Sequence, residues 1–385
     1  MTSLAPRFDP ALGDDPYPRY AELRAVSPVA RAGPGMWAVT RHEDVAALLR
    51  DRRLGHEFPD SARRAFARAG GAPESALRTI VSGLEPPAHT RVRRALTAAF
   101  TPGVVRGMRA GIAAFTDAVL ARARDVGRFD ALADLALPLQ TAVACDLVGV
   151  PEADRAELVA RAVVVGRAFI QVPLVAAGHE AEVAWLRSYV GDLLADRRAR
   201  PGADVLSRLA AGGLSDDEIV DNAVFLFFAG YETAVHLVAA GCAALLEHPE
   251  AWRALTPDGV PGLVEEVLRH DAPIQWVARV TSQPVRVGDH TLREGRAVLL
   301  LIGSANRDER RFPEPDRFRP DRFPNPHLSF GAGVHACLGA VLARAQGAMV
   351  FTRLAALPAF TPAGPAVRRP HPNLRGFTSV PVAVR

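Results

Sequence analysis

The sequence predicts a mainly helical protein with a small β portion, and three observations carry this prediction. Apolar residues recur with helical periodicity through most of the first two-thirds of the chain. One long helix is predicted from Leu214 to about Leu246, and its stretch from Ala223 to Ala229 is apolar on every face. Short β-like runs bounded by turn residues follow in the last third. We expect the long helix to cross the centre of a large domain.

The helices are predicted from local patterns. A helix over 89–100 should stop at Thr101-Pro102, because proline does not continue a helix. Ser215 and Glu218 have the spacing of a capping box at the start of the long helix. The other predicted helices cover residues 15–28, 42–51, 103–125, 131–150, 180–200 and 261–270, with a helix–turn–helix over 149–165.

The β portion is predicted from apolar runs and turn residues. Strands are expected at 276–280 and 296–303, and a hairpin over 284–292 with a Gly-Asp turn. An irregular stretch rich in Pro, Arg and Asp covers 305–330. Residues 373–384 are expected to form a terminal hairpin.

Composition limits the class of protein. The chain has 385 residues, of which 49% are hydrophobic, and it contains no low-complexity linker, so we expect one domain over 1–385. The formal net charge is +4, and all 46 basic residues are Arg. These arginines are interleaved with Asp and Glu rather than clustered, which argues against nucleic-acid binding. One basic face could still dock an acidic protein partner.

The cysteines indicate a reducing compartment. Cys145, Cys242 and Cys337 are odd in number and widely spaced, which argues against a disulfide framework. Cys145 and Cys242 have apolar, helix-like neighbours and are interpreted as small buried hydrophobes. The N-terminus carries Pro and Asp where a signal region would be apolar, and the longest apolar stretches are expected to fall short of a membrane span or to carry Glu and His. We therefore expect a soluble cytoplasmic protein.

The third cysteine lies in the loop "FGAGVHACLG", residues 330–339. Gly331 and Gly333 allow a sharp turn and a close approach of the backbone. A helix is predicted to start at Leu338, and Cys337 at its mouth is where backbone N–H groups and the helix dipole stabilise a thiolate. The loop therefore presents an anionic sulfur to an electrophile.

Three further pairs of residues carry alternatives that the residues alone leave open. Glu232 and Thr233 lie in the apolar helix: either Thr233 bonds back to the carbonyl of Ala229, or the helix is opened beside a ligand and the two side chains move protons. Glu266 and Arg269 share a helix face, as a surface ion pair does. His89 and Arg93 share another face, which could grip carboxylates or be an ordinary basic surface.

Residues 330–344, "FGAGVHACLGAVLAR", resemble the haem-ligand loop of the cytochrome P450 family at every defining position. Three other stretches resemble motifs of the same family in the family's order: "AGYET" at 229–233, "EEVLR" at 265–269 and "FRPDRF" at 318–323. The resemblance covers essentially the whole chain and is closest to the soluble bacterial members. It implies the cytochrome P450 fold, with the long central helix over a haem b group.

The resemblance implies a role for each motif. Cys337 would be the axial thiolate of the haem iron, which favours cleavage of the O–O bond. Glu232 and Thr233 would deliver protons during oxygen activation, although Ala234 and Tyr231 depart from the family pattern and Tyr231 could alter the water channel. The remaining residues implied to bind the haem are His89, Arg93, Arg279, Phe330, Gly331, His335 and Gly339; those implied to form a structural triad are Glu266, Arg269 and Arg322.

The resemblance also implies the reaction. We expect a monooxygenase that inserts one oxygen atom from O2 into a lipophilic small molecule, as a tailoring step of secondary metabolism. The expected pocket residues are Phe225, Ala229, Ile274, Val277, Phe377 and Thr378, together with the segments 55–66 and 169–175. Oxidative coupling and peroxide-driven oxidation are the alternatives, and a non-catalytic haem sensor is disfavoured because the chain shows no output module.

Electrons are expected from outside the chain, because it contains no flavin or iron–sulfur segment. The resemblance implies a ferredoxin and its reductase, docking on the cysteine side of the haem near Arg91, Arg94 and Arg344. Those arginines could equally be ordinary solvated surface charges. We expect the protein to be a monomer.

Overall fold

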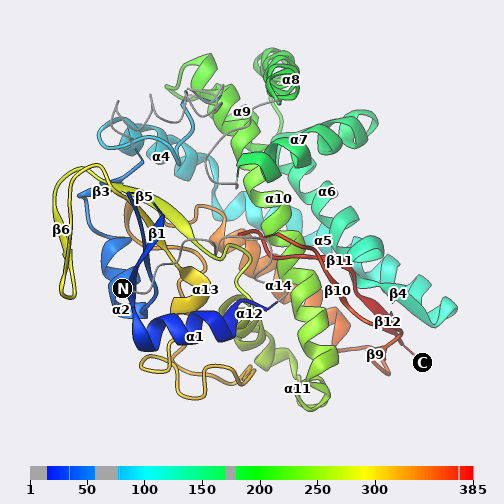
Figure 1. The fold of residues 1–385 in the computed structure, drawn as a ribbon. Helices are drawn as coiled ribbons and strands as arrows, with labels where there is room; N and C mark the ends of the chain where they lie inside the picture. Colours follow the sequence, from blue (N-terminus) through cyan, green and yellow to red (C-terminus); the bar gives the residue numbers. More distant parts are fainter. Residues whose placement is uncertain are drawn as a thin grey trace. The chain divides into compact units, whose positions relative to one another are not determined.

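The computed structural model describes residues 15–33, 35–56, 77, 79–169, 179–371 and 373–384, with the side chains of 167–169 excepted. Its contacts form two compact units. The first unit comprises Met1–Gly55, Ala113–Leu137 and Val235–Arg385, and the second comprises His56–Ile112 and Pro138–Ala234. Figure 1 shows the order of the elements along the chain. The single domain expected from the sequence stays a prediction.

The first unit contains a five-stranded mixed sheet with the order β1-β2-β8-β5-β3. Only β2 and β8 run parallel. The strands are β1 (Val29–Gly33), β2 (Met36–Val39), β3 (Leu54–Gly55), β5 (Val277–Thr281) and β8 (Ala297–Leu300). The strands β5 and β8 were predicted, whereas β1 and β2 were missed.

Both faces of this sheet are covered, as the alternation of its side chains shows. Val39 and Leu300 belong to one buried cluster, which includes residues of α2 (His42–Leu48). Their neighbours Ala38 and Leu299 belong to a second cluster, with the aromatic side of α1 (Tyr17–Val26). Figure 1 shows α1 beside the sheet, next to the short helix α13 (Ile302–Ala305). The sheet thus separates two apolar layers within the first unit.

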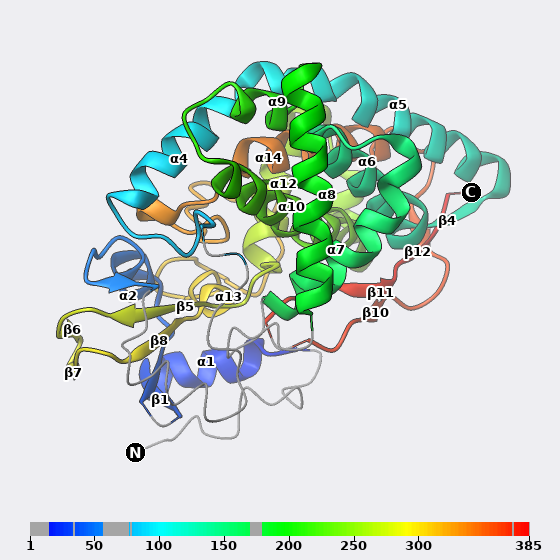
Figure 2. The same cartoon turned by 90° about the horizontal axis from the view of Figure 1, so that it is seen from above.

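The remaining strands form three small sheets. The predicted hairpin is confirmed: β6 (Val285–Val287) pairs with β7 (His290–Leu292), and Figure 2 shows it at the end of β5 and β8. The predicted terminal hairpin is wrong. β11 (Phe377–Ser379) pairs with β10 (Val367–Arg368), whereas β12 (Pro381–Ala383) lies between β4 (Arg128–Asp130) and β9 (Thr361–Pro362).

The physical reason is that the chain has no room to turn back between β11 and β12. Only Val380 separates the two strands, and its N–H donates to the Asp130 carboxylate at 3.1 Å. The Ser379 hydroxyl donates to the same oxygen at 2.5 Å. Asp130, which also caps the following π-helical turn, therefore draws the chain toward β4.

The helices agree closely with the predicted ranges. The capping box of α10 (Asp216–Glu247) is confirmed: the Ser215 N–H donates to Glu218 at 3.0 Å, and the Glu218 N–H donates to the Ser215 hydroxyl at 3.3 Å. The other main helices are α4 (Ala88–Ala99), α5 (Pro102–Val126), α6 (Leu137–Val148), α7 (Arg155–Phe169), α8 (Glu180–Ala199), α12 (Val260–His270) and α14 (Ala340–Leu354). The short ones are η2 (Ala131–Ala136), η3 (Glu152–Asp154), α9 (Val205–Ala210), α11 (Pro249–Arg253), η4 (Pro257–Gly259) and η5 (Gly333–His335).

In the described ranges, two helical segments are long and apolar enough to span a membrane by length and composition alone. They are Ala131–Val148 and Asp216–Glu247, and 61% and 67% of their apolar windows are buried inside the protein. This burial is typical of core helices, which pass the same composition test. The second segment carries Glu232 and His236, as expected, whereas the first departs from the expectation.

Candidate functional site

The cysteine loop turns on two glycines with positive φ. Gly331 has a φ of 65° and Gly333 a φ of 74°, a region that glycine adopts at little cost. The N–H of Cys337 donates to the carbonyl of Phe330 at 2.8 Å and closes the loop. Cys337 is exposed at the end of the loop, shortly before α14 begins.

Gly333 is required by a close approach to α2 rather than by flexibility alone. A Cβ at this position would lie 2.5 Å from the carbonyl oxygen of Leu49, which is backbone and cannot move aside. The loop is therefore seated directly on the C-terminal end of α2. This contact fixes the position from which the loop presents Cys337.

Of the three cysteines, Cys337 alone is exposed. Burial raises the pKa of Cys145 to about 12 and raises the pKa of Cys242 as well, so both stay protonated thiols. This agrees with their interpretation as small buried hydrophobes. A thiolate donor for a metal is therefore available only at the cysteine loop.

Glu266, Arg269 and Arg322 meet in a buried cluster, which excludes a surface ion pair. Both oxygens of Glu266 accept from Arg269, at 2.7 and 2.8 Å, and both accept from Nε of Arg322, at 3.3 and 3.2 Å. The guanidinium groups then bind backbone carbonyls of the irregular stretch: Asn306, Pro315 and Arg317 for Arg269, and Pro313, Glu314 and Arg317 for Arg322. The cluster ties α12 to the chain that leads into the cysteine loop.

The helix α10 is continuous through Glu232 and Thr233. The Thr233 hydroxyl donates to the carbonyl of Ala229 at 3.0 Å, which is the first of the two arrangements considered from the sequence. The Glu232 side chain is buried. No opening of the helix accompanies Gly230 in the part of the chain that the structure describes.

One face of α10 is accessible although its neighbours are buried. Ala229, Gly230 and Thr233 are partly or fully accessible, as are Phe225 and Leu226 one turn earlier. This spacing of three to four residues defines one side of the helix. A Cβ at Gly230 would meet nothing within 4 Å. The helix thus offers a smooth, mostly apolar face that carries a single hydroxyl.

Tyr231 points away from that face. It is buried, and its hydroxyl lies 3.1 Å from the hydroxyl of Thr141 on α6. Gln140, also on α6, donates to the carbonyl of Gly230 at 3.3 Å. Tyr231 therefore attaches α10 to α6, and its expected effect on a water channel stays a prediction.

The basic residues expected to bind a haem lie on several elements. In the second unit, His89 is buried on α4 and Arg93 is half-buried one turn later; burial, with the charge of Arg93, lowers the pKa of His89. In the first unit, Arg279 is buried on β5 and donates to the carbonyl of Ala278 at 2.8 Å. His335 is half-buried in η5.

The expected pocket residues of the first unit divide into two groups. Ile274 and Val277 are partly accessible near the start of β5. Phe377 and Thr378 are neighbours in β11, so their side chains point to opposite faces: Phe377 is buried and Thr378 exposed. The expected role of both residues in one pocket stays a prediction. The expected segments 55–66 and 169–175 lie almost entirely outside the described residues.

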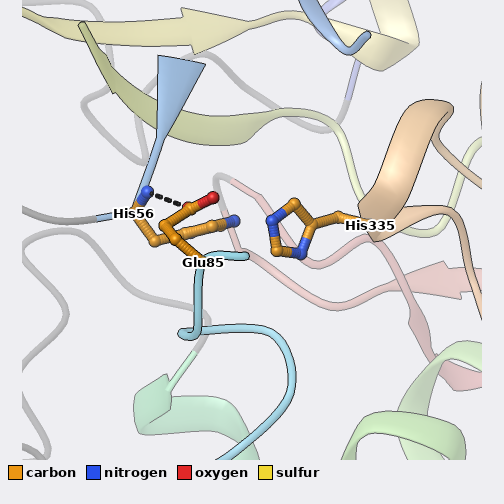
Figure 3. Close-up of side chains that lie close together, drawn as sticks. All are labelled: His56, Glu85 and His335. Atoms are coloured by element: carbon orange, nitrogen blue, oxygen red, sulfur yellow. Dashed lines mark hydrogen bonds between the residues drawn. The ribbon is translucent and has the colours of Figure 1, made fainter. Parts of the chain in front are cut away.

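Two residues were missed because their partners are distant in sequence. Leu374 forms an isolated β-bridge with Ile274, which places it beside an expected pocket residue. In the second unit, Glu85 accepts from the N–H of His56 at 2.8 Å and holds the chain ahead of α4 (Figure 3). No local pattern in the sequence signals either contact. The third residue drawn in Figure 3, His335, belongs to the first unit.

Comparison with known proteins shows the same motifs in context. The family model described as "Cytochrome P450" matches residues 260–366. Nocardicin C N-oxygenase of Nocardia uniformis subsp. tsuyamanensis is 37% identical over 366 residues, covering 88% of this chain and 87% of the relative. The 6-deoxyerythronolide B hydroxylase of Saccharopolyspora erythraea is 33% identical over 409 residues, and 99% of each chain is covered.

A solved structure shows the same fold. The crystal structure of CalO2 superposes with a TM-score of 0.90 at 33% identity, covering 100% of this chain and 99% of that one. The likeness therefore extends over both units and over every motif described above.

Proposed function

The chain belongs to the cytochrome P450 family, and we propose that it hydroxylates or epoxidises a lipophilic small molecule as a tailoring step of secondary metabolism. At the level of class it is a P450 monooxygenase, which uses O2, a redox partner and a haem–thiolate centre. The observation that carries the proposal is the exposed Cys337 at the end of a glycine loop. It is the thiol that a haem can reach, because the other two thiols are buried.

The residues fit a haem held through Cys337, and we take the haem to be haem b. Cys337 offers an accessible sulfur, and the hydrogen bond from its N–H to the carbonyl of Phe330 fixes the turn on which it stands. Gly331 adds no side-chain bulk at this turn, and its positive φ suits glycine. When bound, the haem supplies the activation of O2 and the transfer of one oxygen atom.

The chain's own contribution on α10 is the placing of a proton. Thr233 uses its hydroxyl hydrogen to bond to Ala229, so the lone pairs of Oγ1 stay able to accept a hydrogen bond from the accessible side. Glu232, the adjacent residue, is buried and acidic. We propose that Oγ1 holds a proton donor in position and that Glu232 takes part in resupplying protons.

The accessible face of α10 supports a lipophilic substrate. Its side chains are Phe225, Leu226 and Ala229, with Gly230 adding no bulk. Such an apolar wall binds a substrate by burying the substrate's apolar surface. A small number of polar contacts then set the substrate's orientation. The two named relatives are an N-oxygenase and a hydroxylase, which is consistent with oxygen insertion.

The proposed electron donor is a ferredoxin with its reductase, and we propose a cytoplasmic monomer. Two of the three arginines expected to dock the ferredoxin are already ion-paired: Arg91 with Glu218 and Arg344 with Glu265. Arg94 is exposed and forms no ion pair with any residue that the structure describes. The basic surface offered to an acidic partner is therefore smaller than the sequence suggests.

The carbon monoxide difference spectrum of the reduced protein tests the proposal. We expect a strongly red-shifted Soret band, which is lost in Cys337→Ala and kept in Cys145→Ala, a matched change at a buried thiol. Titration with lipophilic metabolites should then shift the iron to high spin for one class of compound. A haem-loaded, folded protein without the red-shifted band would overturn the proposal.

A further inference from the structure

A network of charged and aromatic side chains lies around the cysteine loop and is not used in the mechanism above. Its members are Glu265 on α12, Arg344 on α14, and His327 and Phe330 in the chain before Cys337. All of them belong to the first unit. No local pattern signals the network, because it joins three separate elements.

Arg344 is held by two bonds. Its Nε and Nη2 donate to the two oxygens of Glu265 at 2.7 and 2.9 Å, which is a bidentate pair of the kind that fixes a guanidinium in one plane. In this position the guanidinium carbon lies 4.4 Å from the centre of the Phe330 ring. Arg344 is about half exposed, with 45% of its side chain accessible.

Glu265 is itself fixed from the other side. Nδ1 of His327 accepts from the N–H of Ser329 at 3.2 Å, which leaves the hydrogen on Nε2, and Nε2 lies 3.0 Å from Glu265. Burial alone would raise the pKa of Glu265, but the bonds from His327 and Arg344 lower it to about 2. The Glu265 carboxylate is therefore ionised. Its hydrogen bonds from His327 and Arg344 hold it in a fixed position.

The positive end of this pair contacts the cysteine loop through Phe330. The ring of Phe330 contacts the Arg344 guanidinium, and the carbonyl of Phe330 accepts a hydrogen bond from the N–H of Cys337. The hydrogen bond from Arg344 to Glu265 raises the pKa of Arg344, burial opposes this shift, and the charges of Glu265 and Cys337 add to it. Glu265 carries the opposite charge and is bound to Arg344.

We propose that Arg344, positioned by Glu265 and His327, tunes the reduction potential of the haem iron through the Cys337 sulfur. This inference rests on the proposed function, because it takes Cys337 as the iron ligand. Reduction adds one negative charge to the haem iron and its cysteine ligand. A fixed positive charge nearby stabilises this reduced state. Removing Arg344 should therefore lower the potential, and removing the charge of Glu265 should raise it.

The test is the reduction potential of the haem-loaded protein, measured by spectroelectrochemistry with small chemical mediators so that no docking protein is involved. In Arg344→Gln we expect the equilibrium constant for reduction to fall by about tenfold, which is about 59 mV for a one-electron couple. In Glu265→Gln we expect a shift of the opposite sign. Arg344→Lys keeps the charge and should stay within about threefold of the wild type.

Arg353→Gln is the matched control. Arg353 lies on the same helix, nine residues further, and pairs with Asp117 at 2.9 Å. At 1.5 Å per residue it is about 13 Å along the helix from Arg344, beyond a Debye length in ordinary buffer. We expect its potential to equal that of the wild type.

The outcomes separate the two proposals. If the wild type lacks the red-shifted carbon monoxide band, Cys337 is not the ligand and both proposals fail. If the band is present in all variants but Arg344→Gln leaves the potential unchanged, the tuning role alone is overturned. Shifts of the same sign in Arg344→Gln and Glu265→Gln would also overturn it, because they would indicate loosening of the loop rather than charge.

Discussion

The guanidinium of Arg269 meets the carboxylate of Glu266 side-on, with Nε 2.8 Å from Oε2 and Nη2 2.7 Å from Oε1, and neither side chain is exposed. A buried pair of this kind is a poor source of stability by itself, because both charges have lost their water. Once it is formed, however, the loss of one partner leaves the other charge uncompensated. Arg322 shares the same carboxylate, so two cations depend on it.

We therefore expect Glu266→Gln to lower the free energy of unfolding by about 3–5 kcal/mol, the usual cost of breaking a buried ion pair. Urea unfolding followed by circular dichroism measures the change. Glu157→Gln is the control, because Glu157 and Arg161 form an exposed pair on α7 that should contribute about 0.5 kcal/mol or less. Equal losses in the two variants would contradict the prediction.

Two glycines in long helices should respond to alanine with opposite signs. At Gly241 on α10, a Cβ would lie 2.6 Å from Cε1 of Phe351, a ring that is fully buried on α14. We expect Gly241→Ala to cost about 1–3 kcal/mol, because a fully buried ring would have to shift in a close-packed core.

Gly111 on α5 is the matched position, since a Cβ there would meet nothing within 4 Å. Gly111→Ala should raise the free energy of unfolding by about 0.5–1 kcal/mol, the gain in helix propensity. Thermal unfolding of both variants gives the comparison. A Gly241→Ala protein as stable as the wild type would show that α10 and α14 can separate at this point.

Contacts such as this one mark the limit of prediction from the sequence. The capping box of α10 was predicted because Ser215 and Glu218 lie within one turn, and the cysteine loop because its residues are consecutive. The strand partners were not predicted. The strand β12 pairs with Asp130, and the residues around Pro381 give no signal of that partner. The Glu265–Arg344 pair was missed for the same reason: its two residues are not near each other in sequence. Local chemistry predicts elements and motifs, whereas pairing depends on the packed fold.

The buried histidine His236 should make the protein sensitive to acid. Its Nε2 lies 2.9 Å from the carbonyl of Asp271, and its ring stacks on Phe377. Burial lowers the pKa of His236 to about 4, although the Asp271 carboxylate opposes the shift; Arg368 and Arg375 add to the lowering. In the unfolded chain the pKa of histidine is about 6.5.

The sign follows from proton binding. Above about pH 6.5 neither state binds a proton at His236, so there is no effect. Between about pH 6.5 and pH 4 only the unfolded state binds one, and stability falls as the pH falls, by about 1.4 kcal/mol per pH unit. His270, whose pKa burial lowers to about 3, adds a second contribution of the same sign.

We expect the wild type to lose about 2 kcal/mol from His236 alone between about pH 7.5 and pH 5.0, and His236→Gln to lack this part of the loss. Urea unfolding at the two pH values measures it. His290→Gln, at an exposed position on β7, serves as the control and should lose as much as the wild type. An unchanged pH dependence in His236→Gln would contradict the prediction.

Thr233→Ala should separate stability from chemistry. Among the residues that the structure describes, the hydroxyl bonds only to a carbonyl of its own helix, and such a bond contributes little to stability. We therefore expect the free energy of unfolding to change by less than about 1 kcal/mol. The product formed per electron pair consumed should fall by at least about tenfold, because the variant lacks the oxygen that we propose positions a proton donor at the accessible face of α10.

The measurement compares product with reductant consumed, using a compound that gives the high-spin shift. Thr233→Ser restores the hydroxyl without the methyl group and should recover most of the coupling. Thr141→Ala removes the hydroxyl that contacts Tyr231 on the other side of α10 and should leave coupling unchanged. If Thr233→Ala formed product as efficiently as the wild type, proton placement would have to be assigned to another group, and the buried carboxylate of Glu232 would be the next residue to substitute.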